Sequence, residues 1–250
     1  MNHLNNKTAL VTGGSRGLGR AIVEALTAQG ANVWAMARDP GNLDVLKQNV
    51  KGVQTLAADV TDPQTASRSL RDIRPDILVL SAGAIPDMRP LHTQSWEQFN
   101  RTWETDVKAT FFFGREALLT PLSPGSVVVI VSSGAAIGGS PLSGSYAGAK
   151  RTQWFLAQYL QQEAKSMNLN IRFVALVPKQ IIGATDLGNN AATIYAAQQG
   201  ITKEQFLERM GAPLLTPEAV GQGVVSLLTD DTYREGIAFG ISGQGMSSLD

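Results

Sequence analysis

Short apolar runs alternate along the chain with longer segments in which apolar residues recur at helical spacing. Seven runs are predicted as strands: Thr8–Val11, Asn32–Ala37, Val53–Ala58, Ile77–Leu80, Ser126–Ser132, Ile171–Val177 and Ile237–Ile241. The intervening segments predict helices over 18–29, 42–50, 63–73, 95–119, 146–167 and 217–229. Because these runs are continuously apolar, they predict parallel strands that are buried on both faces. The pattern therefore indicates an α/β fold, a doubly wound parallel sheet with helices on both faces.

One segment breaks this alternation. Residues 183–213 are rich in small and polar side chains, with one predicted helix near 202–210. The segment follows the carboxyl end of a strand, where open α/β sheets bind ligands. We therefore expect a substrate lid at 183–213, with an ordinary surface excursion as the alternative. No repeat or linker divides the 250 residues, so we expect a single domain over 1–250.

Composition and charge exclude several other classes of protein. Lys plus Arg and Asp plus Glu both number 21, so the formal charge is zero and no basic surface indicates nucleic acid. The apolar runs have the length of strands and predict no membrane span. The chain has no cysteine, which excludes disulfides and thiolate chemistry. The first six residues do not resemble a signal peptide, so the cytoplasm is the expected compartment. We also expect that the protein binds no metal.

A glycine-rich loop, Thr12 to Gly19, joins the first predicted strand to the first helix. Gly13 permits a tight turn, Gly17 allows close approach to a pyrophosphate, and Gly19 allows the helix to pack against the strand. Amide groups at the start of the helix face the phosphates. The spacing is Gly-x-x-x-Gly-x-Gly rather than the general Gly-x-Gly-x-x-Gly. The other dinucleotide-binding candidates in this loop are Ser15, Arg16 and Leu18.

A proton-transfer group is predicted later in the chain. Tyr146 and Lys150 are four residues apart and share one face of a helix. An ordinary tyrosine has a pKa of about 10, and a neighbouring ammonium or an oxidised nicotinamide favours its phenolate. Ser133 adds a hydroxyl at the end of a predicted strand. Together with the glycine loop, these residues indicate a redox enzyme.

The segment Thr12–Gly19, Ser133 and the segment Tyr146–Lys150 together resemble the short-chain dehydrogenase/reductase family. The resemblance extends from Lys7 to about Ile241 and implies one Rossmann-type domain with a seven-stranded parallel sheet. It also implies that Tyr146 exchanges a proton with the substrate oxygen while hydride moves to or from a nicotinamide. By the same resemblance Lys150 contacts the nicotinamide ribose, and Ser133, rather than Ser132, bonds the reacting oxygen.

The resemblance extends to further cofactor positions. Asp59 and Val60 resemble the adenine-binding Asp-Val pair, and the main chain at Pro178 and Ile181 is expected near the nicotinamide carboxamide. Ala82 and Gly83 resemble the end of an Asn-Ala-Gly motif. Ser81 replaces the asparagine of that motif, which puts a structural hydrogen bond in doubt.

Four departures from the family pattern stand out. Asp106 replaces an asparagine that is associated with a water relay from the lysine, and it preserves this relay, weakens it or caps a helix kink. Lys179 replaces a glycine and either projects into solvent or adds charge near the substrate. Gly183 stands where a threonine commonly binds the carboxamide, and whether Thr185 substitutes is open. The tail from Gly240 to Gly245 resembles the family's terminal Asp-Gly-Gly only loosely.

The residues at the end of the second predicted strand indicate which nicotinamide cofactor the protein prefers. A carboxylate at its end usually binds the ribose of NAD, whereas an arginine accommodates the 2′-phosphate of NADP. Here Ala37 is followed by Arg38, and Arg16 offers a second cation. The sequence therefore predicts NADP rather than NAD, although a register error of one residue would bring Asp39 into the NAD-binding position.

The leading hypothesis is an NADP-dependent carbonyl reductase or alcohol dehydrogenase for a small organic substrate. The alternatives are a regulatory protein of the same fold that binds a dinucleotide or ligand with little turnover, and a structural subunit with idle motifs. The resemblance implies a homo-dimer or homo-tetramer formed through helices 95–119 and 146–167. Tyr195 and Phe206 in the lid fit either apolar substrate contact or core packing.

Overall fold

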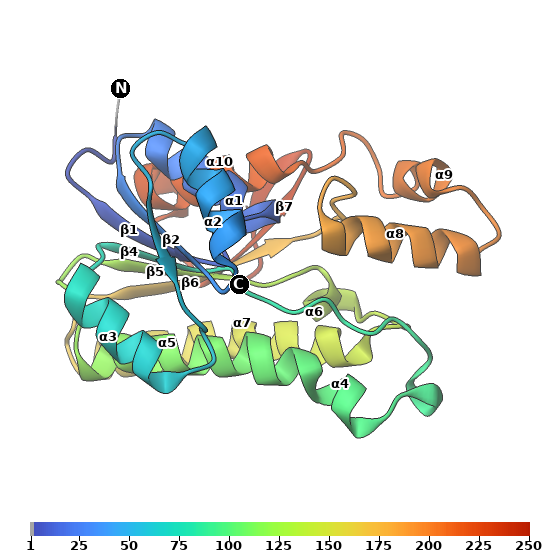
Figure 1. Cartoon of the computed structure of the whole chain (residues 1–250), viewed down its shortest axis with the longest axis horizontal. Helices are drawn as coiled ribbons and strands as arrows, with labels where there is room; N and C mark the ends of the chain where they lie inside the picture. The colour runs from blue at the N-terminus through green and yellow to red at the C-terminus, as the bar shows by residue number, and fades with distance from the viewer. Residues whose placement is uncertain (1–2) are drawn as a thin grey trace.

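The computed structural model describes residues 3–250, which form one sheet between two layers of helices (Figure 1). The strand order is β3-β2-β1-β4-β5-β6-β7-β8. All seven predicted strands form, and they are mutually parallel: β1 Thr8–Thr12, β2 Asn32–Ala37, β3 Gln54–Ala57, β4 Ile77–Leu80, β5 Val127–Val131, β6 Arg172–Pro178 and β7 Ala238–Ser242. The predicted doubly wound α/β fold is confirmed. Its strand order reverses between β1 and β4, which opens a crevice at their carboxyl ends.

The sheet has an eighth strand that the sequence pattern did not predict. β8, Gly245–Ser248, pairs antiparallel with β7. Antiparallel neighbours need only a tight connection, which Gly243-Gln244 supplies here. Because β8 is a mostly exposed edge strand, it lacks the apolar run that marked the others. The prediction of a seven-stranded, wholly parallel sheet is therefore wrong at this edge.

The helices cover the sheet on both faces (Figure 1). α1 (Gly17–Ala28), α2 (Pro40–Asn49) and α10 (Pro217–Thr229) lie on one face. α3 (Pro63–Ile73), α5 (Lys108–Leu119) and α7 (Gly144–Ser166) lie on the other. Each layer buries its own apolar core, one around Ile22 and Val224 and the other around Phe113, Leu160 and Phe173. As predicted, Asp62 and Thr216 cap α3 and α10.

The segment predicted as one helix over 95–119 is divided into three. α4 (Trp96–Thr102) runs into a π-helix, Trp103–Val107, which continues as α5. A π-helix is a wider turn within an α-helix that occurs frequently at functional sites. Here Trp103 packs against Gly148 of α7, and the Thr102 and Ser145 hydroxyls lie 2.7 Å apart. The wide turn places Asp106 beside α7, a position that apolar spacing alone does not predict.

The excursion at 183–213 contains two helices rather than one. α9 (Lys203–Glu208) corresponds to the predicted helix, and α8 (Asp186–Gln198) precedes it. α8 was missed because its small residues give a weak apolar pattern. The two helices share a small core in which the Tyr195 and Phe206 rings stack 5.8 Å apart. Figure 1 shows α8 and α9 beyond the end of the sheet, next to α6 (Ala135–Gly138).

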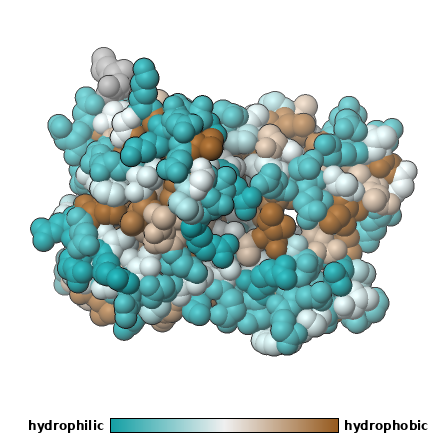
Figure 2. Space-filling view, viewed as in Figure 1, coloured by the Kyte–Doolittle hydropathy of each residue, from teal (hydrophilic) through white to brown (hydrophobic). Residues whose placement is uncertain are grey.

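Within residues 3–250, none of the helices combines the length and apolar character needed to cross a bilayer. The face seen in Figure 2 is mostly hydrophilic, with patches of hydrophobic residues both toward the α8 end of the sheet and on the opposite side.

Candidate active site

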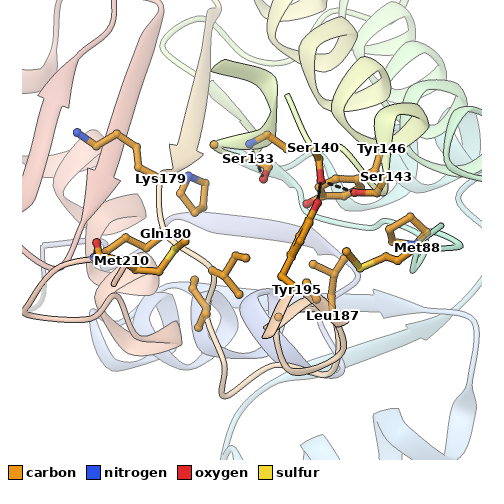
Figure 3. Close-up of a pocket in the computed structure, with 18 of the residues that line it drawn as sticks. Met88, Ser133, Ser140, Ser143, Tyr146, Lys179, Gln180, Leu187, Tyr195 and Met210 are labelled. Carbon is orange, nitrogen blue, oxygen red and sulfur yellow. Dashed lines mark hydrogen bonds between the residues drawn. The ribbon is translucent and has the colours of Figure 1, made fainter. Parts of the chain in front are cut away.

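A cavity of about 470 Å³ opens at the carboxyl ends of β5 and β6, under α8. Ser133 and Tyr146 line it from one side, Leu18 from the glycine loop and Ile181 from the segment after β6. The cavity therefore brings together residues from four distant parts of the sequence. Figure 3 shows Ser133 and Tyr146 with the other residues that line it.

The glycine loop requires its small residues for space. A Cβ on Gly19 would lie 2.1 Å from the Gly13 carbonyl oxygen. Gly13 has a φ of 69°, and a Cβ there would lie 2.8 Å from the backbone of Ala82. Among residues 3–250, no side chain caps the amino end of α1, and the first turn of this helix contains no acidic residue. The amide groups at this end are thus available to an anion such as a pyrophosphate.

Thr12 joins the glycine loop to the strand beside it. Its hydroxyl donates to the Val79 carbonyl and accepts from the backbone amides of Ser81 and Ala82, at 3.1 and 3.3 Å. These bonds tie β1 to the end of β4. The position where Ser81 replaces the family's asparagine is therefore connected to the loop through Thr12.

The residues at the predicted adenine end have distinct roles. The Asp59 carboxylate accepts bonds from the Thr61 amide and hydroxyl, and these, with the charge of Arg38, lower the Asp59 pKa despite partial burial. Val60 is buried in the apolar core. Asp39 caps α2 by accepting from the Asn42 amide at 3.0 Å. Arg38 is exposed directly after β2, so the register that favoured arginine is the one the structure adopts.

Arg16, the second cation predicted for the cofactor, lies in the glycine loop and forms an ion pair with the segment 183–213. Its guanidinium lies 2.8 Å from Asp186 at the start of α8, and both side chains are exposed. Thr185 approaches Gly17 at the same point. The Thr185 hydroxyl accepts from the Gly188 amide and donates to the Ile182 carbonyl, so it is engaged in capping α8.

The two consecutive serines after β5 differ in environment. Ser132 is buried and donates to the Lys150 carbonyl at 2.7 Å, which fixes β5 to α7. Ser133 is half-buried, and its hydroxyl accepts only a local bond from the Ala135 amide within the described chain. The Ser133 hydroxyl can therefore donate to a substrate, in keeping with the choice of Ser133 over Ser132.

Lys150 is buried, and its ammonium contacts three groups. Nζ lies 3.0 Å from Asp106 Oδ2, donates to the Val131 carbonyl at 3.3 Å, and lies 5.6 Å from the centre of the Tyr146 ring. Burial by itself lowers the Lys150 pKa, but the Asp106 carboxylate and Tyr146 more than offset this, so the pKa is raised. Lys150 stays an ammonium across the neutral range and loses this pairing only as pH rises through its raised pKa.

Asp106 is fully buried, and both its carboxylate and its main-chain carbonyl make polar contacts. Oδ1 accepts from the Ala84 amide at 2.8 Å. Oδ2 meets Lys150 as an ion pair but accepts no well-aligned hydrogen bond from any described residue. The main-chain carbonyl accepts from the Thr110 hydroxyl and from Gln153 Nε2, at 2.8 and 3.1 Å. To the roles that the sequence left open for Asp106, the structure adds another, a direct contact of its carboxylate with Lys150.

The residues after β6 hold the base of the lid. Lys179 is exposed, its side chain packs over Gly240 beside Leu249, and Figure 3 shows its amine directed away from Tyr146 and Ser133. The next residue, Gln180, carries the tertiary contacts. Its Nε2 donates to the Met210 and Gly211 carbonyls, both at 3.0 Å.

The Gln180 Oε1 completes this clamp on the far side. It accepts from the backbone amides of Leu215 and Gly243, at 3.0 and 2.9 Å. The unusual tail, which the sequence left without a role, therefore packs against the carboxyl end of the lid. No local pattern predicts this use of Gln180, since its partners lie 30 to 63 residues away.

Hydroxyl groups line the cavity next to Tyr146. Ser140 bonds the Ser143 hydroxyl at 2.6 Å and also bonds the Tyr195 hydroxyl from α8 (Figure 3). The Tyr195 ring packs on Phe206, as the core-packing alternative predicts, and Tyr195 also lines the cavity, while its contact with a substrate stays a prediction. Sequence reasoning missed Ser140 and Ser143, which lie in a glycine-rich stretch without a periodic pattern.

Comparison with known proteins shows the family to which the chain belongs. The sequence model of the family described as short chain dehydrogenase matches residues 7–200, and the chain belongs to this family. The 3-oxoacyl-[acyl-carrier-protein] reductase of Salmonella typhimurium is 32% identical over 180 residues, which cover 68% of this chain and 72% of that protein. L-xylulose reductase of Bos taurus is 32% identical over 133 residues.

The match to L-xylulose reductase covers 52% of this chain and 54% of the relative, so the chain spans about half the length of that protein. Among solved structures, 3-ketoacyl-(acyl-carrier-protein) reductase from Brucella melitensis, complexed with NADH, matches with a TM-score of 0.79. It is 20% identical, and the alignment covers 96% of this chain and 98% of that one. At this identity the likeness supports the fold.

The Gln180 clamp gives a testable prediction. Replacing Gln180 with alanine leaves the Leu215 and Gly243 amides without their acceptor, so we expect a loss of about 1–3 kcal/mol in the free energy of unfolding. Amide exchange at these two positions should accelerate. Denaturant unfolding and hydrogen exchange measure both effects. Gln54→Ala is the matched control, because Gln54 makes one exposed bond at the sheet edge, and equal behaviour of the two variants would contradict the clamp.

Proposed function

We propose that the protein is an NADP-dependent oxidoreductase that interconverts a carbonyl and an alcohol on a small, uncharged organic substrate. The observation that carries this proposal is the shared cavity. Ser133 and Tyr146 line it together with Leu18 of the glycine loop, and Lys150 lies behind Tyr146. Neither a regulatory protein with little turnover nor a structural subunit with idle motifs would need a proton donor and a hydroxyl facing the same space.

The residues support a simple division of labour. Ser133 Oγ donates a hydrogen bond to the substrate oxygen, and Tyr146 Oη gives that oxygen a proton during reduction or removes one during oxidation. Lys150 holds a positive charge beside the phenol. The nicotinamide, when bound, supplies or accepts the hydride. The glycine loop and the uncapped start of α1 fit the pyrophosphate of the dinucleotide. The main chain near Pro178 and Ile181 fits the carboxamide of its nicotinamide.

The lining of the cavity supports an uncharged substrate. None of the described residues that line it is acidic, and the amine of Lys179 points away from Tyr146 and Ser133. Met88, Leu187 and Met210 add apolar surface. A charged substrate would leave its charge unpaired at a desolvated position, which is unfavourable.

We place the lid at residues 183–213, with α8 and α9 as its moving part. Gln180 holds the carboxyl end of the segment, while the Arg16–Asp186 contact is exposed and therefore weak. Closure of α8 over the cavity would exclude water from the reacting atoms.

We also propose a homo-dimer or homo-tetramer. α5 and α7 expose a group of aromatic side chains, Phe111, Phe155 and Tyr159, with the last two stacked 6.2 Å apart. Exposed apolar surface of this kind on adjacent helices is typical of a protein interface.

The main test replaces Tyr146 with phenylalanine. The ring keeps its packing but loses the proposed proton donor, so turnover should fall by roughly 10²–10⁴-fold while dinucleotide affinity changes little. Nicotinamide absorbance, followed over a panel of ketones and alcohols, measures turnover. Tyr233→Phe is the control, because Tyr233 packs against Phe239 away from the cavity. Unchanged turnover in Tyr146→Phe would eliminate the mechanism, and no turnover by the wild type on any compound would favour the regulatory alternative.

The cofactor preference is tested at Arg38. A guanidinium bond to the 2′-phosphate contributes roughly 1.5–3 kcal/mol, about tenfold to a hundredfold tighter binding of NADP than of NAD. Arg38→Ala should weaken NADP binding and leave NAD binding nearly unchanged. Added salt should narrow the difference, because this exposed pair is screened. Dissociation constants for both cofactors decide the matter. Arg71→Ala, an exposed arginine on α3, is the control, and equal affinities in the wild type would refute the Arg38 role.

A further inference from the structure

The buried contact between Asp106 and Lys150 is the feature that the proposed mechanism does not use. Asp106 has no exposed surface, and Oδ2 lies 3.0 Å from Lys150 Nζ. The approach is made possible by Gly83, since a Cβ there would lie 2.9 Å from Asp106 Oδ2. The π-helix fixes the backbone of Asp106 against α7. The carboxylate is thus built into the site rather than placed there by a flexible side chain.

The main-chain carbonyl of Asp106 is committed elsewhere. Thr110 and Gln153 both donate to it, so its two lone pairs are occupied. The polar partners of Lys150 Nζ in the described chain are Asp106 Oδ2 and the Val131 carbonyl. The lysine is therefore paired directly with an anion.

We propose that Asp106 is a positioning residue that acts as the counter-ion of Lys150, keeps Tyr146 protonated to higher pH and thereby favours carbonyl reduction. The argument is one of net charge. With Asp106 as a carboxylate and Lys150 as an ammonium, the buried group is neutral while Tyr146 is a phenol. Tyr146 is half-buried beside this neutral pair, so its ionisation adds a negative charge next to a buried carboxylate without an unpaired cation to balance it, which is unfavourable.

With a neutral residue at position 106, the balance is reversed. Lys150 would then be a buried charge without a carboxylate beside it, and the phenolate of Tyr146, whose ring centre lies 5.6 Å from Nζ, would serve as its counter-ion. Ionisation of Tyr146 would neutralise the group instead of charging it. In this chain Asp106 and the phenolate compete for the same ammonium, and Asp106 already occupies it.

The other ionisable groups around Tyr146 do not alter this balance. Tyr195 of α8 lines the same cavity and bonds Ser140, and Lys179 after β6 directs its amine away. The elements that pack beside Tyr146 from β5 and α6 contribute Ser132, Ser133 and small apolar residues to the lining.

The test measures ionisation of Tyr146 directly by tyrosinate absorbance in a pH titration of the full-length protein. The difference between the wild type and Tyr146→Phe isolates this phenol, and the same difference is taken in an Asp106→Asn background. We expect the midpoint to fall in Asp106→Asn by roughly one to two pH units, as for a unit charge several ångströms away at an effective dielectric constant of about 20. An unchanged or higher midpoint overturns the proposal.

Two further variants keep the test decisive. Asp106→Ser also removes the charge and has a smaller side chain, so it should lower the midpoint of Tyr146 ionisation as Asp106→Asn does. It replaces Asp106→Asn in the test if that variant folds poorly. Asp76→Asn is the matched control, because Asp76 pairs with Lys7 next to β1 and β4, away from the cavity, and its loss should leave the midpoint in place. A shift of equal size in Asp76→Asn would mean a general loss of stability and would overturn the proposal.

The inference rests on the proposed function for its catalytic consequence, and kinetics separate the two. In the wild type, carbonyl reduction should persist to higher pH than in Asp106→Asn, and alcohol oxidation should begin at higher pH. A loss of rate that is equal at every pH would mark Asp106 as merely structural and overturn the proposal. If the wild type turned over no substrate, the proposed function would fail, while the absorbance titration would still decide the role of Asp106.

Discussion

The reversal of strand order between β1 and β4 is the constraint on which the site depends. At this point the backbone after β1 must pass within van der Waals contact of the backbone after β4, which leaves no space for a Cβ on Gly13. The Thr12 hydroxyl bridges the two strand ends and replaces part of the hydrogen bonding that the ladder loses there. The glycine loop, the start of α1 and the residues after β4 are consequently fixed to one another.

The same strand ends determine where charge can be buried. Gly83 follows β4 and leaves room for Asp106, while Ser132 follows β5 and holds the backbone of Lys150. Removing one partner of a buried ion pair costs about 3–5 kcal/mol, because the remaining charge stays desolvated. Neither partner of the Asp106–Lys150 pair can therefore be removed without cost, and the π-helix that presents Asp106 is part of the candidate site.

The proposed lid, residues 183–213, is attached through two sets of contacts that differ in strength, the hydrogen bonds of Gln180 and the ion pair of Arg16 with Asp186. Gln180 satisfies four backbone groups from the lid's carboxyl end and the tail within 3.0 Å, whereas the Arg16–Asp186 ion pair is exposed on both sides. Exposed ion pairs contribute little, about 0–1 kcal/mol. The Gln180 bonds therefore hold the 210–215 end, and a closing motion of the proposed lid would have to come from α8. The apolar contacts of Phe206 and Tyr195 make α8 and α9 one body.

Local sequence pattern was sufficient for the fold. The seven parallel strands, the caps at Asp62 and Thr216 and the glycine loop follow from apolar runs, capping oxygens and the need for space, all of which act over a few residues. The sequence left open whether Arg38 or Asp39 faces the cofactor, and only the structure shows that the Asp39 carboxylate caps α2. β8 and α8 were missed because an exposed edge strand and a helix of small residues give weak periodic patterns.

The sequence by itself determined which chemical groups the site contains: the Ser133 and Tyr146 hydroxyls, the Lys150 ammonium and a carboxylate at position 106. Tertiary structure alone decided what those groups contact. Asp106 and Lys150 are 44 residues apart, and only the π-helix packed on α7 brings Oδ2 to 3.0 Å from Nζ. Gln180 likewise meets partners from the lid and the tail. Periodicity reports which face of an element is buried, but the distance between two buried side chains depends on how separate elements pack.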